Sequence, residues 1–316
     1  MESLFGEVQV AVSDSGSIAY VPGSDRSVGR LGWVDRTGTT ELLHVPERVY
    51  GVVELSPDGT RLAVPVADVM DYVWIYDLGR NEGRKLTAGG PAGWPIWSPD
   101  GQSVVVERFG SAEPGLYRLP VGDRGGVTAE RLWNSKPSLN AYSFAPDGRS
   151  LAVGDFEGQA RVGLLSTLPG SQVEWFPISG NAWGPSFSPD GRYVAYASDE
   201  TGQYEIWVRP VSGASAATQI SVDGGIEPLW SRNGLFYRKG HRWFSAKVTA
   251  LEPKPIWEPP KVAFETDFVD TPGRSYAVSP DGQRLLVVKR TREPIRSKVV
   301  FVQNWFEDVR RLAPKP

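Results

Sequence analysis

A short turn-forming motif recurs along the whole chain, and its spacing constrains the fold more than any other feature. The motif reads Ser-Pro-Asp-Gly in its clearest copies, and full or degenerate copies follow one another at intervals of 42 to 48 residues. They begin at Ser13, Ser56, Ser98, Ala145, Ser188, Ser231 and Ser279. A fixed period of roughly 20–50 residues is typical of repeat architectures. We therefore expect one repeat domain over residues 1–316, with a short C-terminal tail at residues 305–316.

Each unit contains the apolar and β-branched runs of four short strands. In the unit around Ser188 the first run ends at Phe187, and later runs cover residues 192–198, 204–211 and 218–224. The chain also holds 35 Gly and 26 Pro, which suit short strands joined by tight turns. Four strands in about 44 residues are typical of a propeller blade. We predict an all-β propeller of four-stranded antiparallel blades, seven in number, or six if two partial units merge.

The hydroxyl and carboxylate of the motif raise the question of catalysis. A turn requires the same residues, because Pro presets φ at about −65°, Asp bonds the local backbone and Gly takes the left-handed conformation. The degenerate copies keep turn-forming residues and lose the chemistry, since Ala145 has no hydroxyl and Asn233 replaces the Asp. We interpret the motif as structural.

The residue before each turn is large and apolar in most units. The series contains Leu55, Trp97, Phe144, Phe187, Trp230 and Val278. We expect its aromatic members to pack between neighbouring blades rather than to stack on a cofactor. A propeller avoids a long exposed edge only if its last blade is completed by the other terminus. We therefore expect the segment before Ser13, or the tail near Trp305, to close the ring.

Composition excludes several classes of function. The net charge of -3 and the pI of about 5.6 argue against a nucleic-acid or anionic-membrane partner. The absence of Cys excludes a disulfide framework, a thiolate metal site and a Cys nucleophile. No apolar run approaches the roughly 20 residues of a spanning helix, so we expect no membrane insertion. The first ten residues lack the regions of a secretory signal, which leaves a cytoplasmic protein or a piece of a longer one.

Longer stretches carry a resemblance to a known repeat family. They are AVSDSGSIAYVPG, LGWVDRTGTTELL, SFSPDGRYVAYASDETGQYEIWVRPV, ISVDGGIEPLWSRNG and VQNWFEDVRRLAP. Together they resemble TolB-like propeller repeats, most of all the C-terminal extracytoplasmic propeller of certain bacterial serine/threonine kinases. This resemblance implies a monomeric binding or sensor propeller in an extracytoplasmic, periplasmic location. The sequence contains no kinase signature and no G-x-S-x-G nucleophile elbow, the mark of the peptidases that share such propellers.

Propellers bind ligands at the ends of the central channel, so the residues four to seven positions before each turn are candidates. Aromatic faces with a few polar groups suit a small molecule, a glycan, a peptide or a partner protein. The ligand-binding candidates at these positions are Tyr50, Trp94, Trp183, Glu227 and Arg274, and Arg48 and Tyr276 flank the same region. The alternative interpretation is that these side chains only fill the channel.

A second function remains open from the residues alone. Some propeller hydrolases that resemble lactonases or phosphotriesterases hold calcium in the channel, and calcium prefers six to eight oxygen ligands. The metal candidates are Glu54, Asn140, Asn181 and Glu227. A divalent ion there, calcium rather than zinc, would polarise an ester, lactone or phosphotriester. The alternatives are thus a binding module without its own catalytic set and a metal-dependent hydrolase.

Overall fold

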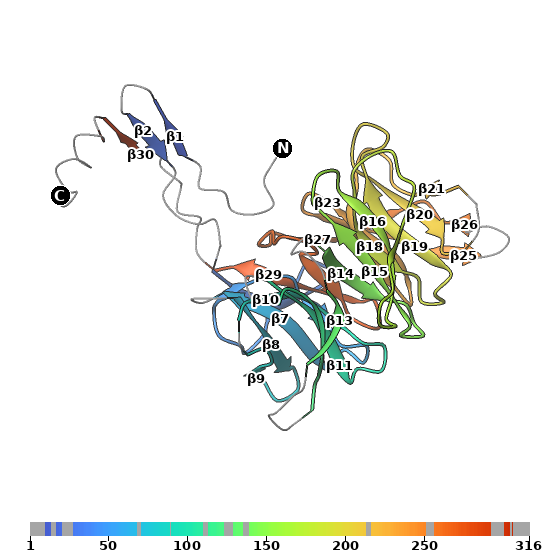
Figure 1. Ribbon diagram of the computed structural model, residues 1–316, viewed down its shortest axis with the longest axis horizontal. Helices are drawn as coiled ribbons and strands as arrows, with labels where there is room; N and C mark the ends of the chain where they lie inside the picture. The colour runs from blue at the N-terminus through green and yellow to red at the C-terminus, as the bar shows by residue number, and fades with distance from the viewer. Residues whose placement is uncertain are drawn as a thin grey trace.

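A computed structural model describes most of the chain. The described residues are 10–13, 17–20, 28–67, 71–88, 90–109, 113–122, 129–134, 139–212, 216–250, 256–291, 300–303 and 305. They form an all-β structure in which six antiparallel sheets surround a common axis (Figure 1). No helix within these ranges has the length and apolar character needed to cross a lipid bilayer.

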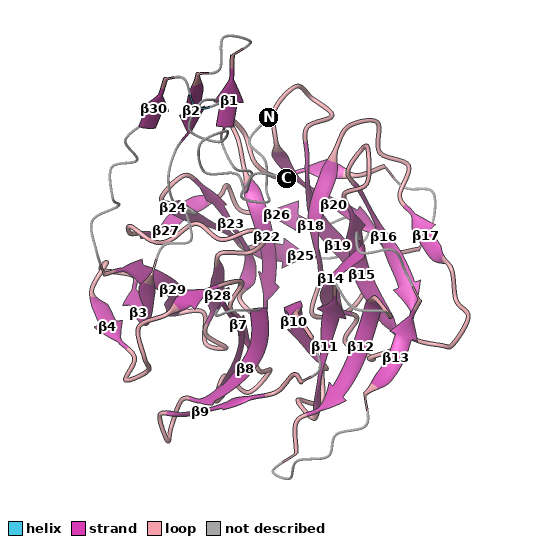
Figure 2. Cartoon of the chain, turned by 60° about the vertical axis from the view of Figure 1, so that its left-hand side comes forward, coloured by secondary structure: helices cyan, strands magenta, loops and turns pink. Residues whose placement is uncertain are grey.

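The six sheets are the blades of a β-propeller (Figure 2). Blade 1 contains β28 (Tyr276–Val278), β29 (Arg284–Arg290), β3 (Gly29–Asp35) and β4 (Thr40–Leu42). Blade 2 contains β5 (Val49–Tyr50) and β6 (Glu54–Leu55), both paired with β7 (Arg61–Ala67), then β8 (Asp71–Asp77) and β9 (Glu82–Lys85). Blade 3 contains β10 (Ala92–Trp97), β11 (Ser103–Arg108), β12 (Gly115–Pro120) and β13 (Glu130–Trp133).

The remaining blades repeat this order. Blade 4 contains β14 (Leu139–Phe144), β15 (Ser150–Asp155), β16 (Arg161–Ser166) and β17 (Val173–Trp175). Blade 5 contains β18 (Ala182–Phe187), β19 (Tyr193–Ser198), β20 (Glu205–Pro210) and β21 (Thr218–Gln219). Blade 6 contains β22 (Ile226–Ser231), β23 (Gly234–Lys239), β24 (Arg242–Ala246) and β27 (Lys261–Glu265), with the hairpin of β25 (Val248–Ala250) and β26 (Ile256–Trp257) inserted.

The ring has six blades because two partial units merge, which is the alternative count and not the seven first expected. Strands β28 and β29 of the last repeat pair with β3 and β4 of the first, through a seven-residue ladder between β29 and β3. Closure by the segment before Ser13 or by the tail near Trp305 was therefore wrong. Strands β1 (Val10–Val12), β2 (Ile18–Tyr20) and β30 (Val300–Val302) form a separate three-stranded sheet, drawn apart from the blades in Figure 1. Residues 306–316 of the expected tail lie outside the described residues.

Hydrogen bonds confirm that the repeated motif forms turns. The N–H of Gly101 donates to the carbonyl of Ser98 at 2.9 Å, and Gly101 has a left-handed φ of 67°. The hydroxyl of Ser98 donates to Asp100 at 2.5 Å and accepts from the N–H of Ser103 at 3.0 Å. The hydroxyl and the carboxylate therefore satisfy each other and the backbone, as turn formation requires.

Cores between the blades hold the ring together. Six clusters of buried side chains each combine residues from two neighbouring blades. The expected wedge residues Trp97, Phe144, Phe187 and Trp230 are all buried. Direct bonds join neighbouring innermost strands, since the N–H of Phe187 donates to Ser143 at 2.9 Å and that of Trp230 to Ser186 at 3.1 Å. The prediction that these aromatics pack between blades is confirmed.

Candidate functional site

The innermost strand of four blades is interrupted by a bulge a few residues before the turn. The register shifts in β10, β14, β18 and β22. In three of these strands the bulge residue precedes a proline and has a positive φ: 51° at Trp94, 66° at Gly184 and 54° at Glu227. Gly adopts this conformation readily, whereas Trp and Glu pay about 1–3 kcal/mol of strain. Two strained residues thus occupy equivalent positions at one end of the central channel.

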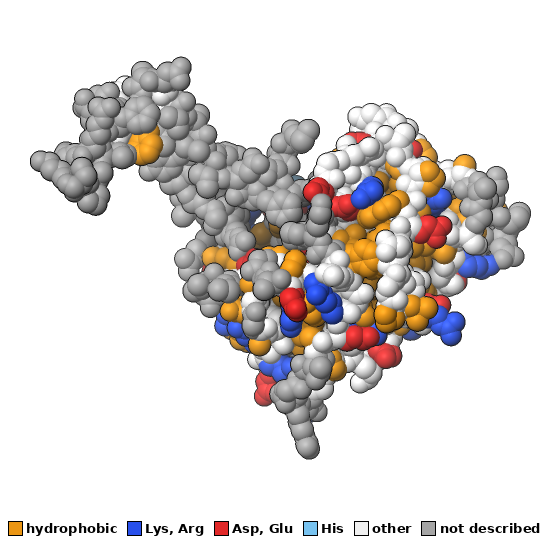
Figure 3. Space-filling model, in the orientation of Figure 1, with side chains coloured by type: hydrophobic (Ala, Val, Ile, Leu, Met, Phe, Trp, Pro, Cys, Tyr) orange, Lys and Arg blue, Asp and Glu red, His pale blue; other side chains and the backbone are white. Residues whose placement is uncertain are grey.

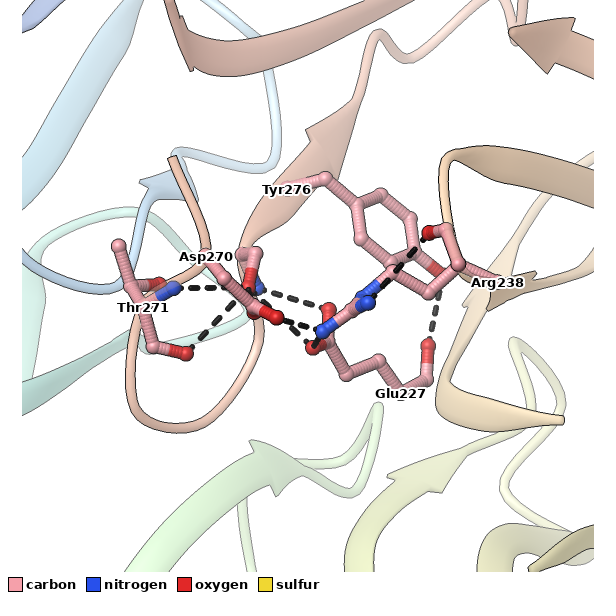
Figure 4. Close-up of polar contacts among 7 residues, drawn as sticks. Glu227, Arg238, Asp270, Thr271 and Tyr276 are labelled. Atoms are coloured by element: carbon pink, nitrogen blue, oxygen red, sulfur yellow. Dashed lines mark hydrogen bonds and ion pairs between the residues drawn. The ribbon is translucent and has the colours of Figure 1, made fainter. Parts of the chain in front are cut away.

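Glu227 is the centre of a buried polar network, which Figure 4 shows. One carboxylate oxygen of Glu227 contacts the guanidinium of Arg238, and the other accepts from the N–H of Ser275 at 2.9 Å. Arg238 also donates to Asp270 at 2.7 Å, and the hydroxyl of Ser275 donates to Asp270 at 3.0 Å. The hydroxyl of Tyr276 donates to the backbone carbonyl of Glu227 at 2.7 Å. These bonds tie blade 6 to the segment that leads into blade 1.

The network runs from the interior to the surface. Glu227 is 1% exposed, and burial raises the pKa of its carboxyl against the opposing effects of Arg238 and the N–H of Ser275. The side chain of Asp270, by contrast, is 68% exposed. One guanidinium therefore holds a buried and an exposed carboxylate together, so that the outer carboxylate reaches solvent in a fixed position.

A second ion pair joins two neighbouring blades at the centre of the ring. Arg274 precedes blade 1, and its Nη2 atom lies 2.7 Å from the Oε2 atom of Glu54 in blade 2. The same nitrogen donates to the backbone carbonyl of Tyr142 in blade 4, across the ring, at 3.4 Å. Burial raises the pKa of Glu54, and Arg274 opposes that effect. The ring of Trp94 lies 5.8 Å from that of Tyr142 and contacts Gly273, so these side chains fill this end of the channel.

Comparisons with known proteins agree with this architecture. No protein-family profile matches the chain. The TolB protein of the Tol-Pal system from Bordetella pertussis is 28% identical over 206 residues, which are 60% of this chain and 45% of that protein. The structure of a putative TolB from Agrobacterium tumefaciens superposes with a TM-score of 0.66 at 19% identity, and covers 84% of this chain and all of that one. The chain is a TolB-like β-propeller.

Two further proteins are similar to the chain. An uncharacterized peptidase, YuxL of Bacillus subtilis, is 29% identical over 151 residues, which are 46% of this chain and 21% of that protein. The TolB structure from Acinetobacter baumannii superposes with a TM-score of 0.55 at 18% identity, over 88% of this chain and 66% of that one. The TolB-like propeller thus spans less than half the length of the curated relatives it matches.

The TolB-like propeller brings four predicted ligand residues into the two networks at the channel end: Trp94, Glu227, Arg274 and Tyr276. The other three predicted ligand residues pack elsewhere, as their contacts show. Arg48 lies over the ring of Trp74 at 5.0 Å, the buried Tyr50 bonds to the carbonyl of Pro46, and Trp183 lies edge-on to Tyr204 at 6.4 Å. A ligand role for all seven stays a prediction.

Among the described residues, the predicted metal ligands do not form one cluster that could coordinate a cation. Glu54 and Glu227 each face an arginine, and Asn181 bonds through its backbone N–H and its side-chain amide to Asp199, at 2.6 and 2.9 Å. No group of three His, Cys, Asp or Glu side chains there is placed to hold a metal ion. Carboxylates compensated by guanidinium groups do not match the oxygen-rich shell of calcium. A metal in the channel stays a prediction.

Sequence reasoning missed several polar residues of the TolB-like channel. Arg238 lies in β23 and Glu107 in β11, and both are buried, at 5% and 4% exposure. Each is a charged residue directly after an apolar run, LFY and VVV, which is the signal that could have marked them. Asp270 and Ser275 lie in the loop before blade 1, where no periodicity constrains their position.

Proposed function

We propose that this propeller is a binding module that holds a partner protein or a smaller ligand at the bulged end of its channel. The observation that carries the proposal is the pair of left-handed residues, Trp94 and Glu227, at matching positions of two innermost strands. Strained backbone persists only where the surrounding structure enforces it, and such strain concentrates at functional sites. Here it fixes an aromatic ring and a buried carboxylate at the channel end.

The charge arrangement also favours binding. Arg238 and Arg274 already compensate Glu227 and Glu54, so these carboxylates act as a rigid support rather than as free acids or bases. The exposed Asp270 presents a fixed acceptor to a partner. On the face drawn in Figure 3, exposed hydrophobic side chains are mixed with acidic and basic ones, a composition suited to protein recognition.

Similarity supports the same proposal. The relative from Bordetella pertussis is named as a protein of the Tol-Pal system, which suits a binding role. The resemblance to propellers of bacterial kinases points to a sensor or scaffold in an extracytoplasmic location, which we include in the proposal together with a monomeric state. The predicted ligand residues Arg48, Tyr50, Trp183, Arg274 and Tyr276 join Trp94 and Glu227 as its candidate contacts.

Site-specific photo-crosslinking tests the proposal. A benzoylphenylalanine in place of Asp270, whose side chain is 68% exposed at the outer end of the Glu227 network, should crosslink a partner in cells that produce the protein. The matched control carries the same residue in place of Leu168, which is 70% exposed on the loop between β16 and β17. A discrete crosslinked product at position 270 but not at 168 supports the proposal. Identical products at both positions, or none at 270, would contradict it.

A further inference from the structure

Glu107 is a buried carboxylic acid without a counter-charge. It lies in β11, is 4% exposed and makes no hydrogen bond or ion pair with any described residue. Its neighbour in the chain, Arg108, is turned away onto the ring of Tyr117 at 4.4 Å. Buried carboxylates normally have a hydrogen-bond partner or a cation, because an unpaired buried charge is costly. Glu54 and Glu227 follow that rule, and Glu107 departs from it.

Other unsatisfied polar atoms and aromatic rings belong to the same part of the propeller. Glu107 pairs across the sheet with Gly93, which has no side chain and immediately precedes Trp94. On β14 of the next blade, the hydroxyl of Tyr142 and the side-chain oxygen of Asn140 are buried without a hydrogen-bond partner among the described residues. Strands β11 and β14 lie in contact, and burial, followed by the charge of Glu107, raises the pKa of the Tyr142 hydroxyl. The ring of Tyr142 contacts that of Trp94.

This combination has the chemistry of a receptor for an organic cation. A primary ammonium has three donors and no acceptor, and it pairs with a carboxylate, neutral oxygen acceptors and aromatic faces. We propose that Glu107 binds the primary ammonium group of a ligand, with Tyr142, Asn140 and the ring of Trp94 completing the site. The inference rests on the proposed binding function, since it gives the channel-end ligand a positively charged group.

A proton should leave Glu107 when the ammonium binds. Burial raises the pKa of Glu107 to about 8, so the free carboxyl is largely neutral at pH 7. The other charges acting on Tyr142 are Glu227 and Arg274, which already have partners. Because the ammonium requires the ionised carboxylate, affinity should rise with pH up to the pKa of Glu107 and then level off. Between pH 6.5 and 8.5 the expected gain is about 25-fold.

Calorimetric titration with defined amines tests the site. The probes are n-butylammonium, N-acetyl-lysine methylamide and the neutral N-acetyl-norleucine methylamide. Binding of both amines would identify the ammonium itself as the recognised group, and binding of the lysine derivative alone would identify a peptide as its source. The norleucine derivative should not bind. Glu107→Gln should weaken amine binding at pH 8.5 at least tenfold and remove its pH dependence.

The control variant is Glu130→Gln, which removes a surface carboxylate from the same blade. Glu130 lies 3.1 Å from Arg118 and is 56% exposed, so its loss should leave amine binding unchanged. Equal binding of lysine and norleucine derivatives, equal affinity in both variants, or no pH dependence would each overturn the proposal. Crosslinking at position 270 that persists in Glu107→Gln, with no amine binding to the native protein, would reject this site and leave the binding function standing.

Discussion

Leu286 of β29 pairs with Trp33 of β3, so residues near opposite ends of the chain share the middle of one blade. Leu31 and Val34 of β3 are fully buried, the first in the core towards blade 2 and the second in the core towards blade 6. Strand β3 therefore closes the ring through its hydrogen bonds and through two inter-blade cores at once.

Two N-terminal truncations should distinguish the contribution of β3 to stability from that of the residues before it. A chain that begins at residue 28 should melt close to the full chain, because all six blades are retained. A chain that begins at residue 45 loses β3 and β4, exposes the edge of β29 and loses side chains worth about 1.5–3 kcal/mol each. Its melting transition, followed by circular dichroism, should be much lower or absent. Equal transitions in the two truncations would refute closure by β3.

The turns of neighbouring blades contact one another, which makes a turn glycine sensitive to substitution. A Cβ on Gly59 would approach the ring of Pro280 in the last turn to 2.7 Å, and Gly59 has a φ of 72°. Gly170 has a similar φ of 76° and nothing within 4 Å of the added carbon. Gly170→Ala should cost about 1 kcal/mol for the left-handed backbone alone. Gly59→Ala should cost at least about 1 kcal/mol more in urea unfolding; equal losses would show that the contact with Pro280 relaxes freely.

Most of the fold could be predicted from the sequence, because each copy of the repeated turn marks the boundary between the first and second strands of a blade. The turn copies at Ser56, Ser98, Ala145, Ser188 and Ser279 all close the same turn, and each is followed by the second strand of a blade. The blade number was harder to predict. The copy at Ser13 looks like the start of another blade, yet its strand β2 pairs with β1 and β30, while β29 pairs with β3. This choice between partners depends on long-range pairing energies, which spacing does not encode.

The candidate site was predictable only in part. Trp94, Glu227 and Arg274 could be placed at the channel end because their distance from the turn fixes their position along the innermost strand. Arg238, the partner of Glu227, lies in a second strand, as does the unpaired Glu107, and Asp270 lies in a loop. The bulge in the innermost strand sets its pairing with the second strand, and this pairing decides which side chains of the second strand lie near the channel. The sequence shows the residue pattern but not that register.

Acid should weaken the turns through their carboxylates. The hydroxyl of Ser98 lowers the pKa of Asp100, as that of Ser56 does for Asp58 and that of Ser279 for Asp281. A lowered folded-state pKa adds stability above the ordinary pKa of Asp and loses it as the pH falls. The stability difference between the native protein and Ser98→Ala should therefore shrink from pH 7 towards pH 2 in urea unfolding. Ser171→Ala, whose hydroxyl bonds to a backbone carbonyl, should show no such trend.

Glu107 should make the protein less stable as the pH rises, the opposite of the trend expected for the turn carboxylates. Its pKa is raised from 4.5 to about 8 by burial, so its contribution to stability is full below pH 4.5 and is lost as the pH rises towards 8. Relative to the neutral, isosteric Glu107→Gln variant, the native protein should lose about 3 kcal/mol between pH 5 and pH 8. Urea unfolding of both proteins at several pH values measures this difference. A constant difference across the range would mean that Glu107 has a partner in solution.

Removing only one member of the buried Glu227–Arg238 pair should lower the free energy of unfolding. Arg238→Met leaves Glu227 buried without a cation, which typically costs about 3–5 kcal/mol. Glu227→Gln should cost less, because Arg238 keeps Asp270 as its partner. The double variant should lose less than the two single losses combined, because no uncompensated charge remains. The same cycle on the exposed pair of Arg118 and Glu130 should give a coupling below about 1 kcal/mol. If the two cycles gave equal coupling energies, solvent would have to reach Glu227, and the channel end would be mobile rather than preorganised.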